Sequence, residues 1–460
     1  MSSTYQLTPH PVGSKREFWA LTWPLMIGLF STSFMFFIDR LFLAKFDPLA
    51  LNASASGGMA YWMFLVVPVG ISAIAEVLAG RLHGEGRFKE VGKATMQMVW
   101  FGLLLTPIFL LIARFFPPLL FSGTGNEEME TAYFQSLTYF APVQCIAIAL
   151  SGFFIGIGKV KMVTAAALIG NLVNVVLDYM MIFGYGPIPS MGVTGAAVAT
   201  GISQVVQVLF LGAIFWNATY RTQFGTKDIG YDHTYFWEGL KIGAPAGFGR
   251  FIETLAHFLF LRIVIMVGAD QMALVTMIQS LYILLIFIVE AESKGAGAIV
   301  SNLLGAKQFK PLNQVLRSSY ILHFSYFILI TVLSLIFYKE VFELFKSDEA
   351  FLADAIYQAT FFKALAFMCL FFLLDGLVWI LMGYLTASGD TKFLFMVSLI
   401  VHWVAYIIPT YWLVGVMRGD AGDAWAVIAC MNVINLTMYL YRYTSGKWLR
   451  AFHQLKPVEA

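Results

Sequence analysis

Long apolar runs, each near the length needed to cross a membrane, set the strongest constraint on how this chain folds. A helix needs about 20 mostly apolar residues to cross the hydrocarbon core of a bilayer. Short loops that leave no room for a soluble domain separate twelve such runs, at 18–44, 56–80, 94–116, 133–157, 163–185, 192–216, 239–267, 272–299, 317–338, 357–385, 393–416 and 423–442. Charged residues make up 12% of the chain, against about 25% in a typical soluble protein. The sequence therefore predicts an all-α integral membrane protein with twelve transmembrane helices.

Basic residues gather in every second loop, and this pattern orients the chain. Cytoplasmic loops of membrane proteins carry an excess of Lys and Arg. The loops that lead from an even-numbered to an odd-numbered span, and both termini, hold Lys15, Arg16, Arg81, Arg87, Lys89, Lys93, Lys159, Lys161, Arg221, Lys227, Lys241, Lys307, Lys310, Arg317, Lys392, Lys447, Arg450 and Lys456. The opposite loops are poor in basic residues, as in GTGNEEMETA at 123–132. We therefore expect a multi-pass protein of the inner or plasma membrane with both termini in the cytoplasm.

The two halves of the sequence resemble each other when one is shifted by 221 positions. Pro24 then pairs with Pro245, and Gly84 pairs with Gly305, within similar loops at 83–91 and 304–312. The alternative is chance similarity. Two sets of six spans in the same orientation form a parallel repeat, in which substrate sites lie near the midplane between the halves. We expect two pseudo-symmetric six-helix lobes, with an N-lobe at 1–216, a cytoplasmic linker at 217–238, a C-lobe at 239–442 and a cytoplasmic tail at 443–460.

Four carboxylates lie well inside the apolar spans, namely Asp39, Asp178, Glu253 and Asp375. An aspartate at the centre of a transmembrane helix costs about 2.5 to 3.5 kcal/mol on insertion scales. Such groups must face a wet cavity, pair with cations or hold protons. Because desolvation favours the neutral form of a carboxyl group, it could take a proton from one side of the membrane and release it on the other.

The stretch NLVNVVLDYMMIFGYG at 171–186 places polar side chains on one face of a helix. Asn174 and Asp178 are four residues apart, and the next span supplies the hydroxyl of Thr200. Together with Asp39 from the first span, these oxygens could coordinate a small hard cation or pass a proton along hydrogen bonds. The alternative is that this polar face only joins neighbouring helices.

The seventh span carries Glu253 three residues after Arg250 and four residues before His257. An internal ion pair between Arg250 and Glu253 is the structural alternative to a functional role for this acid. Asp375, in the tenth span, has no basic residue nearby in its own span.

The eighth span contains FIVEAESKGAGA at 287–298. Glu290 and Lys294 are four residues apart and could neutralise each other. Glu292 points away from both on a helix, and we expect it to face the central cavity.

The order and spacing of several motifs resemble those of the multidrug and toxic compound extrusion (MATE) family, within the wider flippase-like superfamily. The similar stretches are LTWPLMIGLFSTSFMFFIDRLFLAKF at 21–46, GRLHGEGRFKEV at 80–91, NVVLDYMMIFG at 174–184, GAPAGFGRFIETLAHF at 243–258 and LLDGLVWILMGYLTASGDTK at 373–392. The family exports amphipathic, often cationic, organic compounds in exchange for inward H⁺ or Na⁺.

The resemblance implies one coupling site in each lobe. The first comprises Asp39, Asn174, Asp178 and Thr200, and the second comprises Glu253 and Asp375. Each set is a candidate Na⁺ site, and no other metal and no cofactor are expected. Because the chain carries acids typical of two branches of the family, the resemblance leaves open which lobe couples.

Other residues extend these expectations beyond the family's pattern. Arg250, His257 and Glu292 are not part of that pattern, and we expect them to line the substrate cavity. Pro24 and Pro245 hold matching places in the two lobes and are candidate hinges, with static kinks as the alternative.

Three other classes of membrane protein fit the sequence less well. A lipid-linked precursor flippase would need more Arg and Lys in its cavity. A membrane enzyme would cluster its metal ligands or nucleophile, whereas the seven His residues are scattered and the three Cys lie in apolar segments. We find no filter-like loop of a channel.

A net charge of +2 without a basic run gives no hint of a nucleic-acid partner. We therefore expect a monomeric secondary antiporter that works by alternating access, with amphipathic organic solutes and the lipid bilayer as its partners.

Overall fold

A computed structural model describes residues 6–344 and 354–454, which are almost entirely helical. Lys456 and the last residues of the expected tail lie outside this part of the chain. The helices of the first half are α1 (Lys15–Phe46), α2 (Pro48–Ser72), α3 (Ala75–Gly84), α4 (Phe88–Leu104), α5 (Thr106–Phe115), α6 (Pro117–Phe121), α7 (Glu127–Gly156), α8 (Val160–Phe183), α9 (Gly192–Phe215) and α10 (Ala218–Phe224). Those of the second half are α11 (His233–Ile265), α12 (Ala269–Gly305), α13 (Leu312–Ile336), α14 (Tyr338–Leu344), α16 (Ala355–Ala387), α17 (Thr391–Val401), η1 (His402–Ile407), α18 (Ile408–Thr410), η2 (Tyr411–Val416), α19 (Ala421–Thr444) and α20 (Lys447–Gln454).

Each predicted span is helical in the structure, and three of them are interrupted. The second span is α2 and α3, which break at Ala73 and Ile74, and the third is α4 and α5, which break before Pro107. The eleventh span passes through two wide π-helical turns on either side of Pro409. A proline lacks the backbone N–H that a helix interior needs, which explains the local change of geometry at both prolines.

Eleven helical segments in the described residues are long and apolar enough to cross a membrane. The predicted span that this count leaves out is α11, whose 33 residues are ample for a crossing of about 20 residues. It carries Arg250, Glu253 and His257 within otherwise apolar sequence. The polar content that removes α11 from the count is therefore the content that makes it a candidate functional helix.

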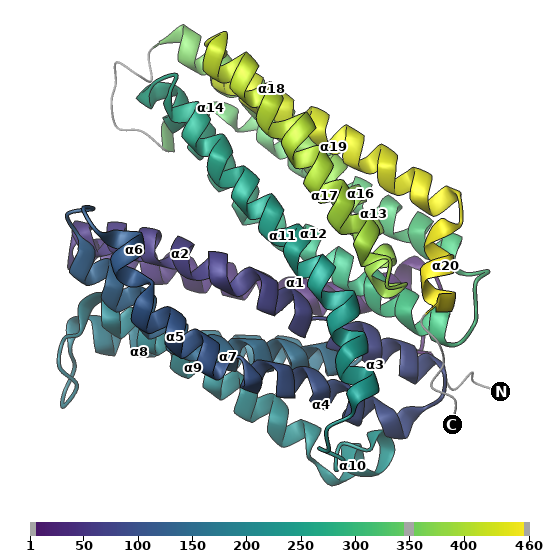
Figure 1. The fold of residues 1–460 in the computed structure, drawn as a ribbon. Helices are drawn as coiled ribbons and strands as arrows, with labels where there is room; N and C mark the ends of the chain where they lie inside the picture. Colours follow the sequence, from purple (N-terminus) through teal and green to yellow (C-terminus); the bar gives the residue numbers. More distant parts are fainter. Residues whose placement is uncertain (1–5, 345–353, 455–460) are drawn as a thin grey trace.

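The helices form two bundles that diverge from a common end (Figure 1). One bundle runs from α1 to α9 and the other from α11 to α19, in the order of the two expected lobes. The bundles spread apart toward the end that carries α6 and α14, and they meet near α3 and the C-terminal end of α12. We refer to them as the N-bundle and the C-bundle.

The crossing of α3 and α12 has an internal two-fold character. A Cβ atom added at Gly84 would lie 2.0 Å from the carbonyl oxygen of Asn302, and one added at Gly305 would lie 2.1 Å from the carbonyl oxygen of Arg81. A shift of 221 positions converts each of these contacts into the other. The sequence repeat is therefore present as a symmetric helix crossing, and only glycine permits the two backbones to approach so closely.

Two further close approaches join the bundles. Gly80 packs against Ser301, its own counterpart in the repeat. Between α2 and α11, a Cβ atom at Gly70 would lie 2.7 Å from the Cα atom of Gly247. Small residues at helix crossings let backbones approach and increase van der Waals contact in membranes.

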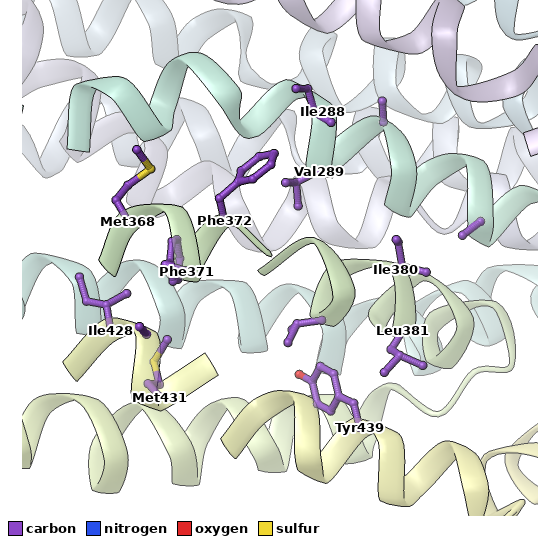
Figure 2. Packing of buried hydrophobic residues seen from close by; sticks show 14 of the residues in the cluster. Ile288, Val289, Met368, Phe371, Phe372, Ile380, Leu381, Ile428, Met431 and Tyr439 are labelled. Atoms are coloured by element: carbon purple, nitrogen blue, oxygen red, sulfur yellow. The ribbon is translucent and has the colours of Figure 1, made fainter. Parts of the chain in front are cut away.

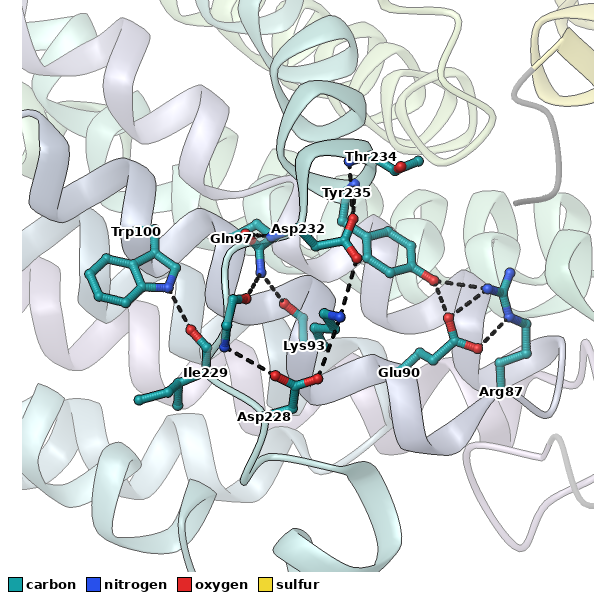
Figure 3. Close-up of polar contacts among 11 residues, drawn as sticks. Arg87, Glu90, Lys93, Gln97, Trp100, Asp228, Ile229, Asp232, Thr234 and Tyr235 are labelled. Atoms are coloured by element: carbon teal, nitrogen blue, oxygen red, sulfur yellow. Dashed lines mark hydrogen bonds and ion pairs between the residues drawn. The ribbon is translucent and has the colours of Figure 1, made fainter. Parts of the chain in front are cut away.

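The segment between the bundles lies along α4 rather than hanging free (Figure 3). The indole N–H of Trp100 donates to the carbonyl oxygen of Ile229 over 2.8 Å. The ammonium group of Lys93 lies 3.4 Å from Asp228 and 3.3 Å from Asp232. These contacts fix the path of the chain from the N-bundle into α11.

A second group of contacts fixes the start of α11. The hydroxyl of Tyr235 donates to Glu90, which also pairs with Arg87 at 2.6 Å (Figure 3). Nearby, the guanidinium of Arg81 lies 2.5 Å from the carboxylate of Glu238. Both groups join the N-bundle to α11 by charged hydrogen bonds, which are stronger than neutral ones.

The described ends of the chain lie on the same face of the molecule. Leu7 lies against Gly158, between α7 and α8, and the hydroxyl of Ser318 donates to the carbonyl oxygen of Gly13. At the other end, the ring of His453 stacks on Phe309, between α12 and α13. An even number of crossings requires this arrangement.

Buried apolar side chains from α12, α16 and α19 form the core of the C-bundle (Figure 2). Val289, Met368, Phe372 and Ile428 belong to this core, and all are buried. Asp375 follows Phe372 on the same helix, so this packed layer fixes the position of a carboxylate that the sequence marked as functional.

Candidate functional site

In the N-bundle, Asn174 contacts two other predicted site residues, and the charge of the fourth, Asp39, interacts with that of Asp178. Asn174 lies between Asp178, one turn further along α8, and Thr200 on α9. In the amide orientation that satisfies both neighbours, its nitrogen donates to Asp178 over 3.0 Å and its oxygen accepts from the backbone N–H of Thr200 over 3.2 Å. Asp39, on α1, is 5% exposed, and neither Asn174 nor Asp178 is exposed.

Asp39 and Asp178 are two acids of like charge, and the cation that acts on Asp39 is its sequence neighbour Arg40. Their charges interact, and both also act on the buried hydroxyl of Tyr133. The Oδ1 atom of Asp39 is buried and accepts no hydrogen bond from the described residues. An unpaired buried acceptor is costly, so this atom is suited to hold a proton or to contact a small cation.

Asn171 contacts a different helix from Asn174, although both lie on the polar face of α8. Its amide nitrogen donates to the hydroxyls of Ser31 and Thr32 over 3.0 and 3.1 Å. These contacts join α8 to α1. Asn171 therefore fits the alternative interpretation, in which the polar face joins neighbouring helices.

The C-bundle holds its two predicted acids in a second polar group. Asp375 accepts hydrogen bonds from the hydroxyl of Tyr282 and from the amide of Asn432, the latter over 2.9 Å. Glu253 accepts from the hydroxyl of Ser398 over 2.9 Å. The charges of Glu253 and Asp375 interact. Sequence reasoning missed Tyr282, Asn432 and Ser398, because each comes from a different helix and carries an ordinary uncharged side chain.

The ion pair between Arg250 and Glu253, the structural alternative, does not form among the described residues. The guanidinium carbon of Arg250 instead lies 4.1 Å from the ring centroid of Trp379 on α16. Stacking on an aromatic face stabilises a guanidinium without neutralising a carboxylate. Arg250 and Glu253 therefore have different partners, Trp379 and Ser398.

His257 lies between two uncharged partners on other helices. Its Nδ1 atom is 3.3 Å from the hydroxyl of Tyr406, and its Nε2 atom is 2.8 Å from the amide nitrogen of Gln279. Both ring nitrogens thus have protein partners, and the expected contact of His257 with substrate stays a prediction.

The structure corrects the expected placement of Glu292. Its side chain is not exposed at all, and its Oε2 atom lies 2.7 Å from Nδ1 of His323 on α13. The other ring nitrogen of His323 lies 3.1 Å from the carbonyl oxygen of Phe372. The imidazole occupies the space where a side chain at Gly376 would begin, next to Asp375. Helical spacing correctly predicted that Glu292 points away from Glu290, but it could not show that α13 covers the face of α12 that carries Glu292.

Glu290 and Lys294 form the expected ion pair, with Nζ and Oε1 3.3 Å apart. Both side chains are about one-third exposed. The pair stands beside a cavity in which sequence reasoning missed one acid, Glu76. That residue lies near the end of the predicted second span, where a charge is easily taken for the edge of the membrane.

The two candidate hinge prolines lie inside unbroken helices. Pro24 is within α1 and Pro245 is within α11. The hydroxyl of Thr164 donates to the carbonyl oxygen of Pro24 over 2.6 Å, which joins α8 to α1 at this level.

A site built only from His, Cys and acidic ligands does not occur in the described residues. The three cysteines are free thiols. A cation held by this protein would have to use the mixed carboxylate, amide and hydroxyl oxygens described above, which suit a hard ion.

Curated relatives match most of the chain. A probable multidrug resistance protein NorM from Thermotoga maritima is 23% identical over 89% of this chain and 88% of the relative. Another protein of that name, from Acinetobacter baylyi, is 25% identical over 93% of this chain and 96% of the relative.

Solved structures of transporters share the fold from end to end. The outward-facing conformation of a multidrug resistance MATE family transporter of the MOP superfamily matches with a TM-score of 0.84 at 18% identity, over 98% of this chain and 99% of that one. A MOP superfamily transporter from Pyrococcus furiosus, whose reversed pocket polarity suggests a different function, matches with a TM-score of 0.84 at 19% identity over the same shares.

The family model MatE matches residues 24–180 and 245–412, one segment in each bundle and together more than half of the chain. This chain therefore belongs to the MatE family, the multidrug and toxic compound extrusion transporters, and is a multi-pass membrane transporter rather than an enzyme.

Proposed function

We propose that the protein is a secondary antiporter that exports amphipathic organic compounds in exchange for H⁺ or Na⁺. The observation that carries this proposal is the pair of interacting acids inside each bundle. Asp39 and Asp178 interact in one bundle, and Glu253 and Asp375 interact in the other. No Lys or Arg in the described residues forms an ion pair with any of these four carboxylates.

The acids favour ion exchange over a purely structural role. Structural carboxylates inside a membrane pair with cations, as Glu290 does with Lys294. Asp39 instead keeps a buried oxygen atom without a hydrogen-bond partner in the described chain. A proton or a hard cation bound there would remove the cost of that isolated charge.

Ion binding could drive transport because it changes the relative stability of two arrangements of the bundles. A ligand shifts such an equilibrium only by its difference in affinity for the two states. In our proposal the cavity between the bundles loads solute from the cytoplasm, and the bundles then rock to open outward. A cation binds the carboxylates there and weakens the hold on a charged solute. Pro24 and Pro245 would absorb the bending of α1 and α11.

The cargo is proposed from the relatives and from the composition of the site. The two relatives described above are named as probable multidrug resistance proteins. In this chain the C-bundle offers Arg250, stacked on Trp379, together with His257 and the acids Glu253 and Asp375. We propose that Arg250 and His257 contact substrate from the C-bundle. The protein would act as a monomer in the inner or plasma membrane, with both termini in the cytoplasm.

Transport in proteoliposomes tests this function. Efflux of an amphipathic dye is measured with either a pH gradient or a Na⁺ gradient imposed alone. The wild type is compared with Asp39→Asn, Glu253→Gln and Asp375→Asn. Glu130→Gln is the control. This buried carboxylate near the N-terminal end of α7 accepts a hydrogen bond from the hydroxyl of Thr124, and the other end of α7 borders the cavity beside Glu76.

One gradient should drive transport by the wild type and by the control. Substitutions in the coupling bundle should abolish the response. If neither gradient drives transport of any amphiphile tested, antiport is wrong. If only Glu253→Gln and Asp375→Asn abolish transport, coupling belongs to the C-bundle alone.

A further inference from the structure

A cavity of about 160 Å³ lies inside the N-bundle, and Lys294 on α12 of the C-bundle lines one side of it. Apolar side chains from α1, α7 and α8 form most of its wall, including Leu29, Ile155 and Val163. Its charged members are Glu76 on α3 and Lys294 on α12. Neither the expected coupling residues nor the expected substrate contacts include these two.

The packing of α3 fixes Glu76 at the boundary between the bundles. Cβ atoms at Gly152 and Gly156 would each lie 2.7 Å from the backbone of Glu76, so α7 holds this backbone closely. On the opposite side, Oε1 of Glu76 lies 3.4 Å from where a Cβ atom at Gly297 would be. Gly297 is the counterpart of Glu76 in the repeat. The acid therefore lies near the pseudo-symmetry axis, and the second repeat supplies no matching charge.

The carboxylate of Glu76 has no hydrogen-bond or ion-pair partner among residues 6–344 and 354–454. Lys294 and Glu290 both act on its charge, with opposite effects. Since Lys294 is already paired with Glu290, this group of three side chains has one acid more than it has bases. A carboxylate in an apolar wall attracts a positive group that can replace the water it has lost.

We propose that this cavity is a binding subsite for the ammonium end of an amphipathic organic solute, with the Glu76 carboxylate as its counter-ion. This inference rests on the proposed function and names the class of solute that it would carry. A cavity of about 150 Å³ holds a molecule the size of benzene. The subsite therefore takes an amine on a short alkyl or aryl group, while the rest of the solute lies between the bundles.

The position of the subsite makes its affinity depend on the state of the transporter. Its walls come from the N-bundle, but Lys294 and Gly297 come from the C-bundle. Rocking of the bundles would change the position of Glu76 relative to these residues and therefore the shape of the cavity. Solute affinity would therefore differ between the two states, as transport requires.

A pair of fluorescent probes tests the subsite in purified, detergent-solubilised protein without any gradient. Dansylcadaverine carries an ammonium group on a five-carbon chain, and N-pentyl dansylamide has the same chain without the amine. Binding is followed by fluorescence anisotropy for the wild type, Glu76→Gln, Glu76→Asp and Ala167→Leu, which adds bulk to the cavity wall. Glu130→Gln is the matched control, and gel filtration confirms the folding of each variant.

Glu76→Gln should weaken the binding of dansylcadaverine about tenfold or more and change the affinity for the neutral probe less than twofold. Glu76→Asp should give an intermediate loss, Ala167→Leu should weaken both probes, and Glu130→Gln should change neither. Equal affinity of Glu76→Gln and wild type for dansylcadaverine would overturn the proposal, as would full affinity in Ala167→Leu. Because binding is measured at equilibrium, a failure of gradient-driven transport would count against antiport and leave this result intact.

Discussion

Glu292 and His323 face each other between α12 and α13 with Oε2 and Nδ1 2.7 Å apart, and neither side chain is exposed. The second oxygen of Glu292 accepts no hydrogen bond from the described chain. The pair therefore depends on this contact, and on that of His323 with the carbonyl oxygen of Phe372, to offset the cost of two desolvated groups.

Loss of one member of this pair should destabilise the protein strongly. Removing one partner of a buried ion pair typically costs about 3 to 5 kcal/mol, whereas replacing both by apolar groups is often neutral. We expect His323→Leu to lower the melting temperature in detergent markedly and Glu292→Met/His323→Leu to recover much of the loss. The matched control is Lys294→Met, which breaks a pair that is about one-third exposed and worth about 1 kcal/mol or less. If His323→Leu melts like the wild type, the pair is not important for stability.

Alanine at the symmetric crossing of α3 and α12 should be harmful despite the better helix propensity of alanine. A Cβ atom at Gly84 would overlap the carbonyl oxygen of Asn302, so Gly84→Ala must push the two bundles apart. By contrast, a Cβ atom at Gly58 would meet only the ring of Tyr133 at 3.6 Å. Gly58→Ala should therefore be neutral or add up to about 1 kcal/mol of stability. Equal melting temperatures for the two variants would show that the crossing tolerates side chains.

The linker should detach from α4 when Gln97 is replaced. Its amide donates to the carbonyl oxygen of Gly230 over 3.0 Å and accepts from the backbone N–H of Asp232 over 2.9 Å. Gln97→Leu leaves both backbone groups unpaired, at a cost of about 1 to 3 kcal/mol each where they stay buried. We expect faster amide hydrogen exchange across 225–232. Gln135→Leu, which loses one contact to Ala113, should leave this exchange unchanged. Slow amide exchange across 225–232 in Gln97→Leu would mean that the other contacts are enough to hold the linker on α4.

Substitutions of Asn171 and Asn174 on α8 should affect stability and ion coupling separately. Asn171 joins α8 to hydroxyls of α1, whereas Asn174 contacts Asp178. Asn171→Ala should lower the melting temperature and keep the response to an ion gradient. Asn174→Ala should weaken that response, measured as the ratio of transport with and without the gradient. Loss of the response in Asn171→Ala alone would reverse these assignments.

Features that follow from local pattern were predictable from the sequence. Apolar length predicts the spans, and the pairing of Gly84 with Gly305 predicts the symmetry seen where α3 crosses α12. The four-residue spacing of Glu290 and Lys294 predicts their ion pair. Each of these depends on the geometry of a single helix or on the repeat.

Contacts between helices distant in sequence were not predictable in the same way. Arg250 is three residues from Glu253, but Trp379 offers it an aromatic face from another helix. Glu292 could be turned away from Lys294 by helical geometry, yet nothing in its own span indicates His323. The rotation of each helix in the bundle decides such partners, and a single sequence does not contain that rotation.

The central claim is that ion binding at the buried acids and solute movement are coupled, and reversing the exchange tests it most directly. Proteoliposomes with no ion gradient receive a gradient of organic solute, and the flow of H⁺ or Na⁺ is followed with an internal pH dye or with radioactive sodium. We predict that the solute gradient drives one of these ions in the opposite direction in the wild type. We also predict that Asp39→Asn/Asp178→Asn/Glu253→Gln/Asp375→Asn moves neither ion. Ion flow that persists in this variant, or solute movement in the wild type without any ion flow, would contradict the account.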